Sequence, residues 1–217
     1  MSLLSTYLKE KLQVNKNIKS GYNYKPKDSH ELRKIIVEKV KEENGGTEKY
    51  PVDLNDIDVS EITDFRNLFH YVNWEQKLTA IDISGWDMNK ATDLSSMFID
   101  CKFLKKIGDI SGWDISNVTD IHSMFSGCKK IKNIGNIGKW KVDNVLNFNF
   151  LFKNCEKLEP INIDNWKINN TVTKNGAKMI ISGTAGWKIP TWVKQLKKNF
   201  KFIKYEIYDT IYTGNLQ

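Results

Sequence analysis

Apolar positions recur with a long, regular period between residues 57 and 181. Tryptophans lie 27, 27 and 26 residues apart, and a set of phenylalanines lies 29, 27 and 27 residues apart. A fixed period of this size is typical of repeat proteins, in which each copy packs only against its neighbours. The recurring residues are Trp86, Trp113, Trp140 and Trp166, then Phe69, Phe98, Phe125 and Phe152, then Cys101, Cys128 and Cys155.

Around each tryptophan, apolar and polar residues alternate. This alternation predicts a short strand with one buried face, so we expect the tryptophans to point inward and their polar neighbours outward. The three successive columns are Ile57, Trp86, Trp113, Trp140 and Trp166; Asp58, Asp87, Asp114, Lys141 and Lys167; and Val59, Met88, Ile115, Val142 and Ile168.

A helical turn is expected after each strand. Thr63, Thr92 and Thr119 are each followed by an aspartate, and either side chain accepts hydrogen bonds from the amides that open a helix. The phenylalanines follow one turn later, on the face that looks back at the sheet. Each copy is therefore predicted to be a strand, a capped helical turn and a return loop.

The ends of the chain carry their own helix signals. Leu4, Leu8 and Leu12, with Tyr7 alongside, predict an amphipathic docking helix over residues 1–14, followed by a linker over 15–27. Such a helix is too short to be stable alone in water. We therefore expect it to dock on its own chain or on another subunit.

A second helix start precedes the repeats. Asp28 and Glu31 have the spacing of a capping box, and the glycines at 45 and 46 end the pattern, which predicts an N-terminal capping helix within 28–50. Residues 51–187 hold four clear repeats and one degenerate copy. Pro190 opens a predicted capping helix, and residues 188–217 end in a predicted strand.

Together these elements predict an α/β solenoid. We expect a short, leucine-rich-repeat-like, right-handed coil with a parallel sheet on one face and helical caps at both ends. The prediction depends on the recurring tryptophans, phenylalanines and cysteines lying above one another in successive coils.

The segment Ser-Gly-Trp-Asp-Ile-Ser-Asn-Val-Thr-Asp-Ile-His-Ser-Met-Phe-Ser-Gly-Cys, residues 111–128, resembles the BspA-like repeat of mycoplasma lipoproteins and bacterial surface proteins. The likeness extends over about residues 54–183. It implies a parallel-sheet solenoid with no enzymatic activity and a role in adhesion or protein binding. The chain departs from the family in having few repeats and neither a secretion signal nor a lipobox.

A second resemblance is to proteins encoded by crAss-like phages. It is carried by Tyr-Leu-Lys-Glu-Lys-Leu-Gln-Val-Asn-Lys-Asn at 7–17, Lys-Pro-Lys-Asp-Ser-His-Glu-Leu at 25–32 and Asp-Leu-Asn-Asp-Ile-Asp-Val-Ser at 53–60. It implies a virion protein made in the host cytoplasm, which would explain a surface-type repeat without a signal peptide.

Charge and cysteine content narrow the classes of partner. The net charge is +7, but it is carried by lysine, with arginine only at positions 33 and 66. Arginine is the residue that forks onto phosphates and base edges, so specific nucleic-acid binding is not expected. The three cysteines share one column and no signal peptide precedes them, which predicts a buried, reduced ladder.

Localisation is predicted from what the termini lack. Charged residues at 9–11 interrupt the apolar run that a secretory signal needs, and no stretch approaches the roughly 20 apolar residues of a membrane span. We expect the virion or the host cytoplasm, or alternatively the cell surface by association.

Catalytic, cofactor and metal motifs are not found. His30, His70 and His122 lie in unrelated columns, and the acidic run from Asp53 to Asp64 lacks the glycine and glutamate of a calcium loop. The charged column that follows the tryptophans has two interpretations. It is either a solvated ladder or a binding strip graded from acidic to basic.

The expected function is therefore non-enzymatic protein–protein contact, as an accessory structural component of a phage virion. Partners would be proteins such as virion subunits. Two alternatives stay open: an adhesin or host-receptor-binding module, and an enzyme using the aspartate columns, which is disfavoured because catalytic groups converge from non-equivalent positions. The predicted partner-binding residues are Leu4, Tyr7, Leu8, Leu12, Asp87, Asp114, Lys141 and Lys167.

Overall fold

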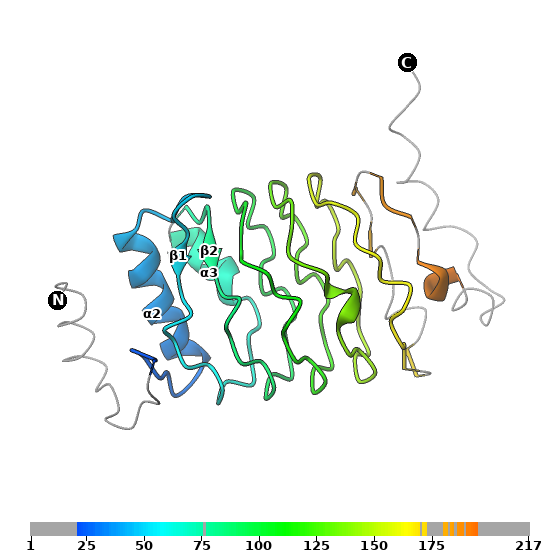
Figure 1. Cartoon of the computed structure of the whole chain (residues 1–217), viewed down its shortest axis with the longest axis horizontal. Coiled ribbons are helices and arrows are strands. Elements are labelled where there is room, and N and C mark those ends of the chain that lie inside the picture. The colour runs from blue at the N-terminus through cyan, green and yellow to red at the C-terminus, as the bar shows by residue number, and fades with distance from the viewer. Residues whose placement is uncertain are drawn as a thin grey trace, which may run out of the picture.

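The computed structural model describes residues 21–75, 77–169, 171–172, 180–181, 183–184, 186–188 and 190–194. Its elements, in order, are helix α2 (Ser29–Glu42), strand β1 (Val52–Asp53), helix α3 (Leu68–Glu75), strand β2 (Ile81–Asp82) and the 3-10 helix η1 (Ile137–Lys139). Residues 191–194 are also helical. The coils lie side by side in a row, with α2 against the first of them (Figure 1). The predicted helix of residues 1–14 and the predicted terminal strand lie outside the described residues.

Helix α2 begins where the capping pattern predicts. The Asp28 carboxylate accepts a hydrogen bond from the Glu31 amide at 2.8 Å, and the Glu31 carboxylate accepts one from the Lys27 amide at 2.9 Å. The first contact satisfies an amide that a helix start leaves without a partner inside the helix, and the second ties the residue before the cap back to the first turn. The helix covers the N-terminal end of the core with its buried side chains, Leu32, Ile35, Ile36, Val37 and Val40.

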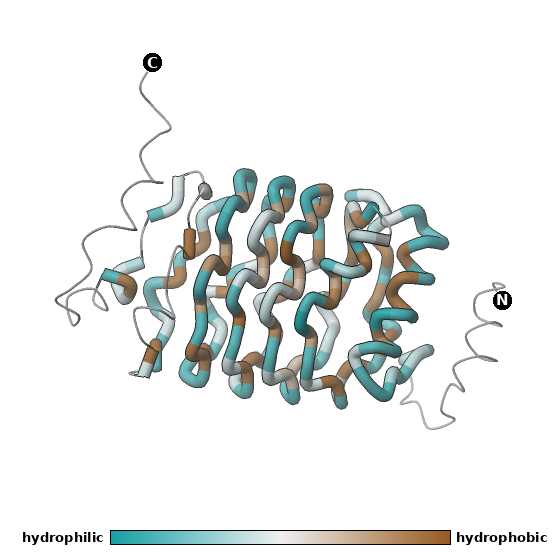
Figure 2. Tube along the Cα trace, turned by 180° about the vertical axis from the view of Figure 1, so that it is seen from behind, coloured by the Kyte–Doolittle hydropathy of each residue, from teal (hydrophilic) through white to brown (hydrophobic). Residues whose placement is uncertain are grey.

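The interior is filled by side chains that stack from coil to coil. The Phe98 ring lies nearly parallel to that of Phe69, with centroids 4.8 Å apart, and to that of Phe125, at 5.4 Å. Trp113 and Trp140 are parallel as well, at 6.3 Å. The predicted stacking of the tryptophan, phenylalanine and cysteine columns is thus confirmed, and all of them are buried. Apolar and polar positions alternate along each coil (Figure 2).

The backbone of each coil is a chain of turns. In the coil after Asp93, the amides of Ser96 and Phe98 donate to carbonyls of the next coil, at 2.8 Å each. The amide between them, that of Met97, donates three residues back to the Leu94 carbonyl at 3.2 Å. Ser96 has a φ of 56°, the left-handed geometry that the third residue of a type II turn requires. This conformation recurs at the equivalent positions Asn67, Ser123 and Phe150, and a second left-handed position follows four residues later at Asp100, Gly127 and Asn154.

The predicted fold class, an α/β solenoid with a leucine-rich-repeat-like coil, a parallel sheet on one face and helical caps at both ends, is wrong. The only sheet among the described residues is the parallel pair β1–β2, with Val52 opposite Ile81. No strand forms at the tryptophans, and the helical turn expected in every copy is present only as α3. Amides that alternate between the next coil and a turn cannot make the continuous ladder of a strand or a helix. The described C-terminal helix covers only 191–194.

Contacts between coils continue past the last clear repeat. The Ile180 carbonyl accepts a hydrogen bond from the Phe152 amide at 2.8 Å, as the Met124 carbonyl does from the Phe98 amide in an earlier coil. Trp192, which lies in the helical residues 191–194, is the next member of the tryptophan column. Its ring stacks on Trp166 at 6.3 Å, and its Nε1 donates to the Ile163 carbonyl at 3.0 Å. The 26-residue spacing from Trp166 was the signal for it.

Candidate interaction site

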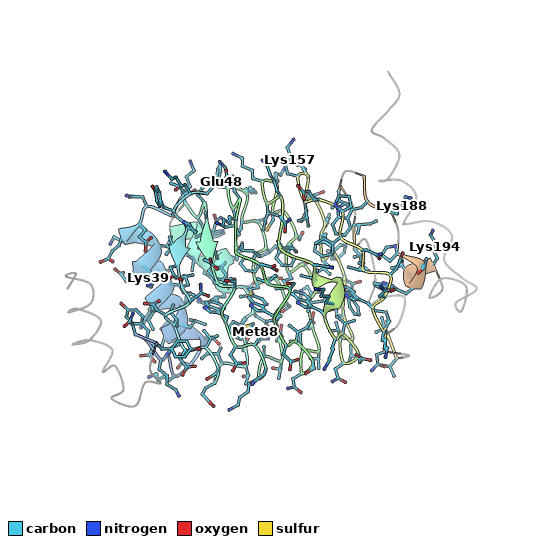
Figure 3. All side chains as sticks on the ribbon, in the orientation of Figure 1. Lys39, Glu48, Met88, Lys157, Lys188 and Lys194 are labelled. Carbon is cyan, nitrogen blue, oxygen red and sulfur yellow. The ribbon has the colours of Figure 1, made fainter. Side chains whose placement is uncertain are left out.

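The charged column lies on one edge of the coils, which we call the Asp/Lys edge (residues 87–90, 114–117, 141–144 and 167–169). Its predicted partner-binding residues are all exposed, namely Asp87, Asp114, Lys141 and Lys167. Asp58, in the same column, is only 2% exposed and has the Lys25 ammonium at 3.6 Å. Met88, which follows Asp87, lies along the lower part of the molecule in Figure 3. The predicted outward direction is therefore confirmed for every member except Asp58.

The aspartates of this edge also hold their own turns. The Asp87 carboxylate accepts a hydrogen bond from the Asn89 amide at 3.1 Å, and Asp114 accepts one from the Ser116 amide at 3.0 Å. Hydrogen bonds from Ser116, aided by the positive charge of Lys141, hold the pKa of Asp114 below its ordinary value. The Asp114 carboxylate is therefore ionised at neutral pH, and both carboxylates are fixed in place by their turns.

A column of asparagines ties the Asp/Lys edge together. The side-chain amide of Asn117 donates to the Asn89 carbonyl of the preceding coil at 2.6 Å. Asn144 and Asn169 repeat this contact at 2.7 and 3.0 Å. None of these asparagines was among the predicted site residues, although their near-constant spacing is visible in the sequence. Because every coil is fastened to the one before it, the edge is a regular surface.

A second acidic column, Asp64, Asp93 and Asp120, was predicted to cap helical turns. Each carboxylate does accept the amide two residues on, at 2.9, 2.8 and 2.8 Å, but the segment that follows is helical only in the first coil. The column is bridged from coil to coil in parallel register, and Asn147 continues it. Two of its carboxylates also contact the side chain two residues further on: Asp64 contacts Arg66 at 2.7 Å, and Asp120 contacts His122 at 2.9 Å.

The cysteines form the predicted ladder. All three are free and buried, and their thiols donate to phenylalanine carbonyls one coil back, with Cys128 at 3.1 Å from the Phe98 oxygen and Cys155 at 2.9 Å from that of Phe125. Burial raises the pKa of Cys155 to about 12 and raises those of Cys101 and Cys128 as well. Because the thiolate is the reactive form, these are structural cysteines.

Two shallow hollows open where the backbone ladder is interrupted. The Ile83 and Ile110 amides donate to the next coil, at 3.2 and 3.1 Å, but that of Ile137 turns back to Gly135. The hollow beside it, of about 430 Å³, is lined partly by Lys132 and Glu159; a neighbouring one of about 320 Å³ shares its Pro160–Asn162 wall. Among the described residues, no group of His, Cys, Asp or Glu side chains is arranged to hold a metal ion.

A third surface consists of exposed aromatic residues that no column predicted. Trp74 is 78% exposed at the end of α3, and Phe103 is 42% exposed in the loop after Cys101. Lysines flank Phe103 from both neighbouring coils, with the ammonium of Lys77 at 5.0 Å and that of Lys130 at 5.2 Å from the ring centre. The only sequence signal was that Trp74 stands outside the tryptophan column.

The remaining predicted partner-binding residues, Leu4, Tyr7, Leu8 and Leu12, lie outside the described part of the chain. In the part that is described, no helix is both long and apolar enough to cross a membrane.

The arrangement defines a class: a repeat protein whose core side chains recur once per coil and whose edges carry the variable residues. The family described as "Mycoplasma protein of unknown function, DUF285" matches residues 63–192, and the chain belongs to this family. This membership agrees with the resemblance to mycoplasma and bacterial surface-protein repeats. No curated protein and no solved structure matches the chain.

Proposed function

We propose that the chain is a non-enzymatic structural protein that binds other proteins through the edges of its coils. The supporting observation is the way its side chains divide. Tryptophans, phenylalanines and cysteines fill the interior in register, while the charged residues stand outside in regular columns. The interior side chains serve packing. The outer columns form extended surfaces of the kind that repeat proteins use for binding.

The more specific proposal is an accessory component of a phage particle. It is supported by the resemblance of residues 7–17, 25–32 and 53–60 to crAss-like phage proteins. In this proposal the chain acts in the virion or the host cytoplasm, and virion subunits bind its predicted N-terminal helix or its C-terminal strand.

The rival proposal is an adhesin or host-receptor-binding module. It is supported by the exposure of Asp87, Asp114, Lys141 and Lys167 along one edge, where acidic coils give way to basic ones. A receptor with the opposite order of charges would be matched both in sign and in register.

Two full-length variants separate these proposals. In one, Leu4, Tyr7, Leu8 and Leu12 are each replaced by serine. In the other, the edge is reversed by Asp87→Lys, Asp114→Lys, Lys141→Glu and Lys167→Glu. Wild type and both variants, with melting temperatures matched to within a few degrees, are mixed with a particle fraction and with host cells, and the bound fraction is measured.

A virion component predicts that wild type co-sediments with particles, that the serine variant does not, and that the edge variant still does. An adhesin predicts binding to cells that the edge reversal abolishes and the serine changes leave intact. A chain that binds neither particles nor cells would contradict the protein-binding proposal itself, as would a turnover reaction that is lost when Asp93 or Asp120 is replaced by alanine.

A further inference from the structure

We propose that Trp74, Phe103 and the lysines around them form a docking surface for an acidic protein segment that carries a large apolar or aromatic side chain. We call this the return-loop edge: residue 48, residue 77 and the loops 102–106, 129–132 and 156–159, with Trp74 at its border. This inference rests on the proposed protein-binding function and names the surface and the class of partner.

The aromatic residues of this surface do not contribute to the packed interior. Every tryptophan of the column is at most 6% exposed, whereas Trp74 is 78% exposed. Tryptophan is the residue most strongly enriched among the side chains that dominate binding energy at protein interfaces. Its neighbour on α3, Tyr71, is 43% exposed, and the Arg33 guanidinium lies 4.2 Å from its ring centre. An apolar side chain of a partner would find a matching surface here.

The charge of the return-loop edge differs from that of the opposite side. It carries eight lysines and three glutamates, a net charge of +5, whereas the Asp/Lys edge carries three lysines and three aspartates, a net charge of zero. Figure 3 shows Glu48 and Lys157 along its rim. The lysines are Lys77, Lys102, Lys105, Lys106, Lys129, Lys130, Lys132 and Lys157, and the glutamates are Glu48, Glu156 and Glu159.

Most of these lysines have no ion-pair partner in the described part of the chain. Lys105 pairs with Glu48 at 2.9 Å and Lys129 with Glu156 at 2.8 Å, and these are the ion pairs that the edge makes. Lys77 and Lys130 instead approach the Phe103 ring, an interaction that leaves their ammonium groups free to donate hydrogen bonds to a carboxylate as well. The local excess of positive charge favours an acidic partner and speeds its encounter.

The platform beneath these side chains is held by backbone hydrogen bonds. The Asp100 amide donates to the Ser126 carbonyl and the Gly127 amide to that of Lys153, both at 2.7 Å, which joins three successive loops. The Asn73 side chain reaches the Asp100 carbonyl at 3.4 Å and so ties the end of α3, next to Trp74, to the loop that carries Phe103. A surface ordered in advance loses less entropy on binding.

An acidic protein segment fits this surface better than a nucleic acid does. All eight cations are lysines, which act as point charges and lack the planar fork that arginine presents to phosphates. The two most exposed rings of the surface stand at its border and in its centre, and no row of rings follows the lysines as in a groove that stacks successive bases. A carboxylate-rich segment with one apolar anchor uses both features.

The test uses the full chain and four fluorescent probes in fluorescence anisotropy at low salt. The probes are a 15-residue peptide of glutamate and serine with a central Leu-Phe pair, the same peptide with the pair replaced by serine, the same peptide with lysine in place of glutamate, and a 15-nucleotide oligo-dT. The acidic peptide with the apolar pair is expected to bind at least about tenfold more tightly than each of the others.

Two sets of variants locate the contact. Trp74→Ala and Phe103→Ser are each expected to weaken binding about tenfold, because they remove the apolar contacts. The pair Lys77→Glu and Lys130→Glu is expected to do the same and to improve binding of the basic peptide. Its matched control, Lys141→Glu with Lys167→Glu, changes the net charge equally on the opposite edge and should alter binding by less than about twofold.

Tighter binding of oligo-dT, no binding of the acidic peptide, or equal losses from both double reversals would overturn the proposal. If the acidic peptide fails while the chain still sediments with particles or binds cells, the return-loop edge is not the docking surface and the proposed function stands. If those assays fail as well, the proposed function falls with it.

Discussion

The indole Nε1 of Trp113 donates a hydrogen bond to the carbonyl oxygen of Ile83, one coil back, at 3.2 Å. The same contact recurs from Trp86 to Leu54, Trp140 to Ile110, Trp166 to Ile137 and Trp192 to Ile163, at 2.9 to 3.0 Å. The tryptophans therefore do more than fill the interior. Each one adds a hydrogen bond from the next coil to a buried carbonyl that already accepts a backbone amide within its own coil, and so fixes the register between the two coils.

The first prediction concerns this contact. Trp113→Phe keeps an aromatic ring but removes the indole donor. The Ile83 carbonyl then keeps only the Trp86 amide, at 3.2 Å, and a gap opens beside the smaller ring. We expect a loss of about 1–3 kcal/mol in the free energy of unfolding, measured by urea denaturation. Trp74→Phe, at an exposed position outside the column, should change it by less than about 0.5 kcal/mol. Equal losses from both changes would contradict the assigned role.

The second prediction concerns the left-handed turns. Ser96 has a φ of 56°, whereas the neighbouring Ser95 is outside this region. Ser96→Gly should stabilise the chain by about 0.5–1 kcal/mol because glycine adopts this conformation without steric cost, and Ser95→Gly should destabilise it by a similar amount. Thermal unfolding of the two variants gives the comparison. A loss of stability in both would mean that the turn geometry is not as described.

The third prediction concerns the acidic column that bridges the coils. Asp93 accepts the Ser95 amide at 2.8 Å, and Asn147 fills the equivalent place with an amide oxygen on Asn149 at 3.2 Å. Asp93→Asn should therefore cost less than about 0.5 kcal/mol, whereas Asp93→Ala should cost about 1 kcal/mol because it leaves that amide without its acceptor. Urea midpoints of the two proteins test this difference. An asparagine variant as unstable as the alanine one would point to the charge instead.

The fourth prediction is a dependence of stability on pH. Burial raises the pKa of Cys155 to about 12 from an ordinary value of 9.0, so above pH 9 the unfolded chain releases a proton that the folded chain retains. The stabilising contribution of this thiol is complete below pH 9 and is lost as the pH rises from 9 toward 12. The melting temperature should fall more steeply between pH 8.5 and 10.5 in the wild type than in Cys155→Ala, which lacks the titrating group. Parallel curves for the two proteins would refute the assignment.

Side-chain positions were predictable from the sequence, and backbone conformation was not. Period alone placed Trp86, Phe98 and Cys128 in stacked interior columns, because each coil packs on an equivalent of itself. The same alternation around Trp86 predicted a strand, yet none forms there. Alternation reports which side chains are buried, and a chain of turns whose amides alternate between two partners produces it as well as a strand does.

Of the residues on the candidate surfaces, some were predictable from the sequence and others were not. Asp87 and Lys141 were found because they repeat, and the structure places both on the surface. Trp74 and Phe103 do not repeat, so periodicity carried no information about them. Their importance arises from exposure and from the lysines that adjacent coils bring beside Phe103, neither of which is a local property of the sequence.

The Trp113 hydrogen bond joins only adjacent coils, and this has a consequence for changes in the number of coils. Excising an internal 27-residue unit, such as residues 102–128, would bring the Trp140 donor to the place that Trp113 now occupies, and the carbonyl of Ile83 would receive it unchanged. We therefore expect the packing to tolerate in-frame duplication or loss of a unit, with the row of coils becoming longer or shorter by one coil at a time.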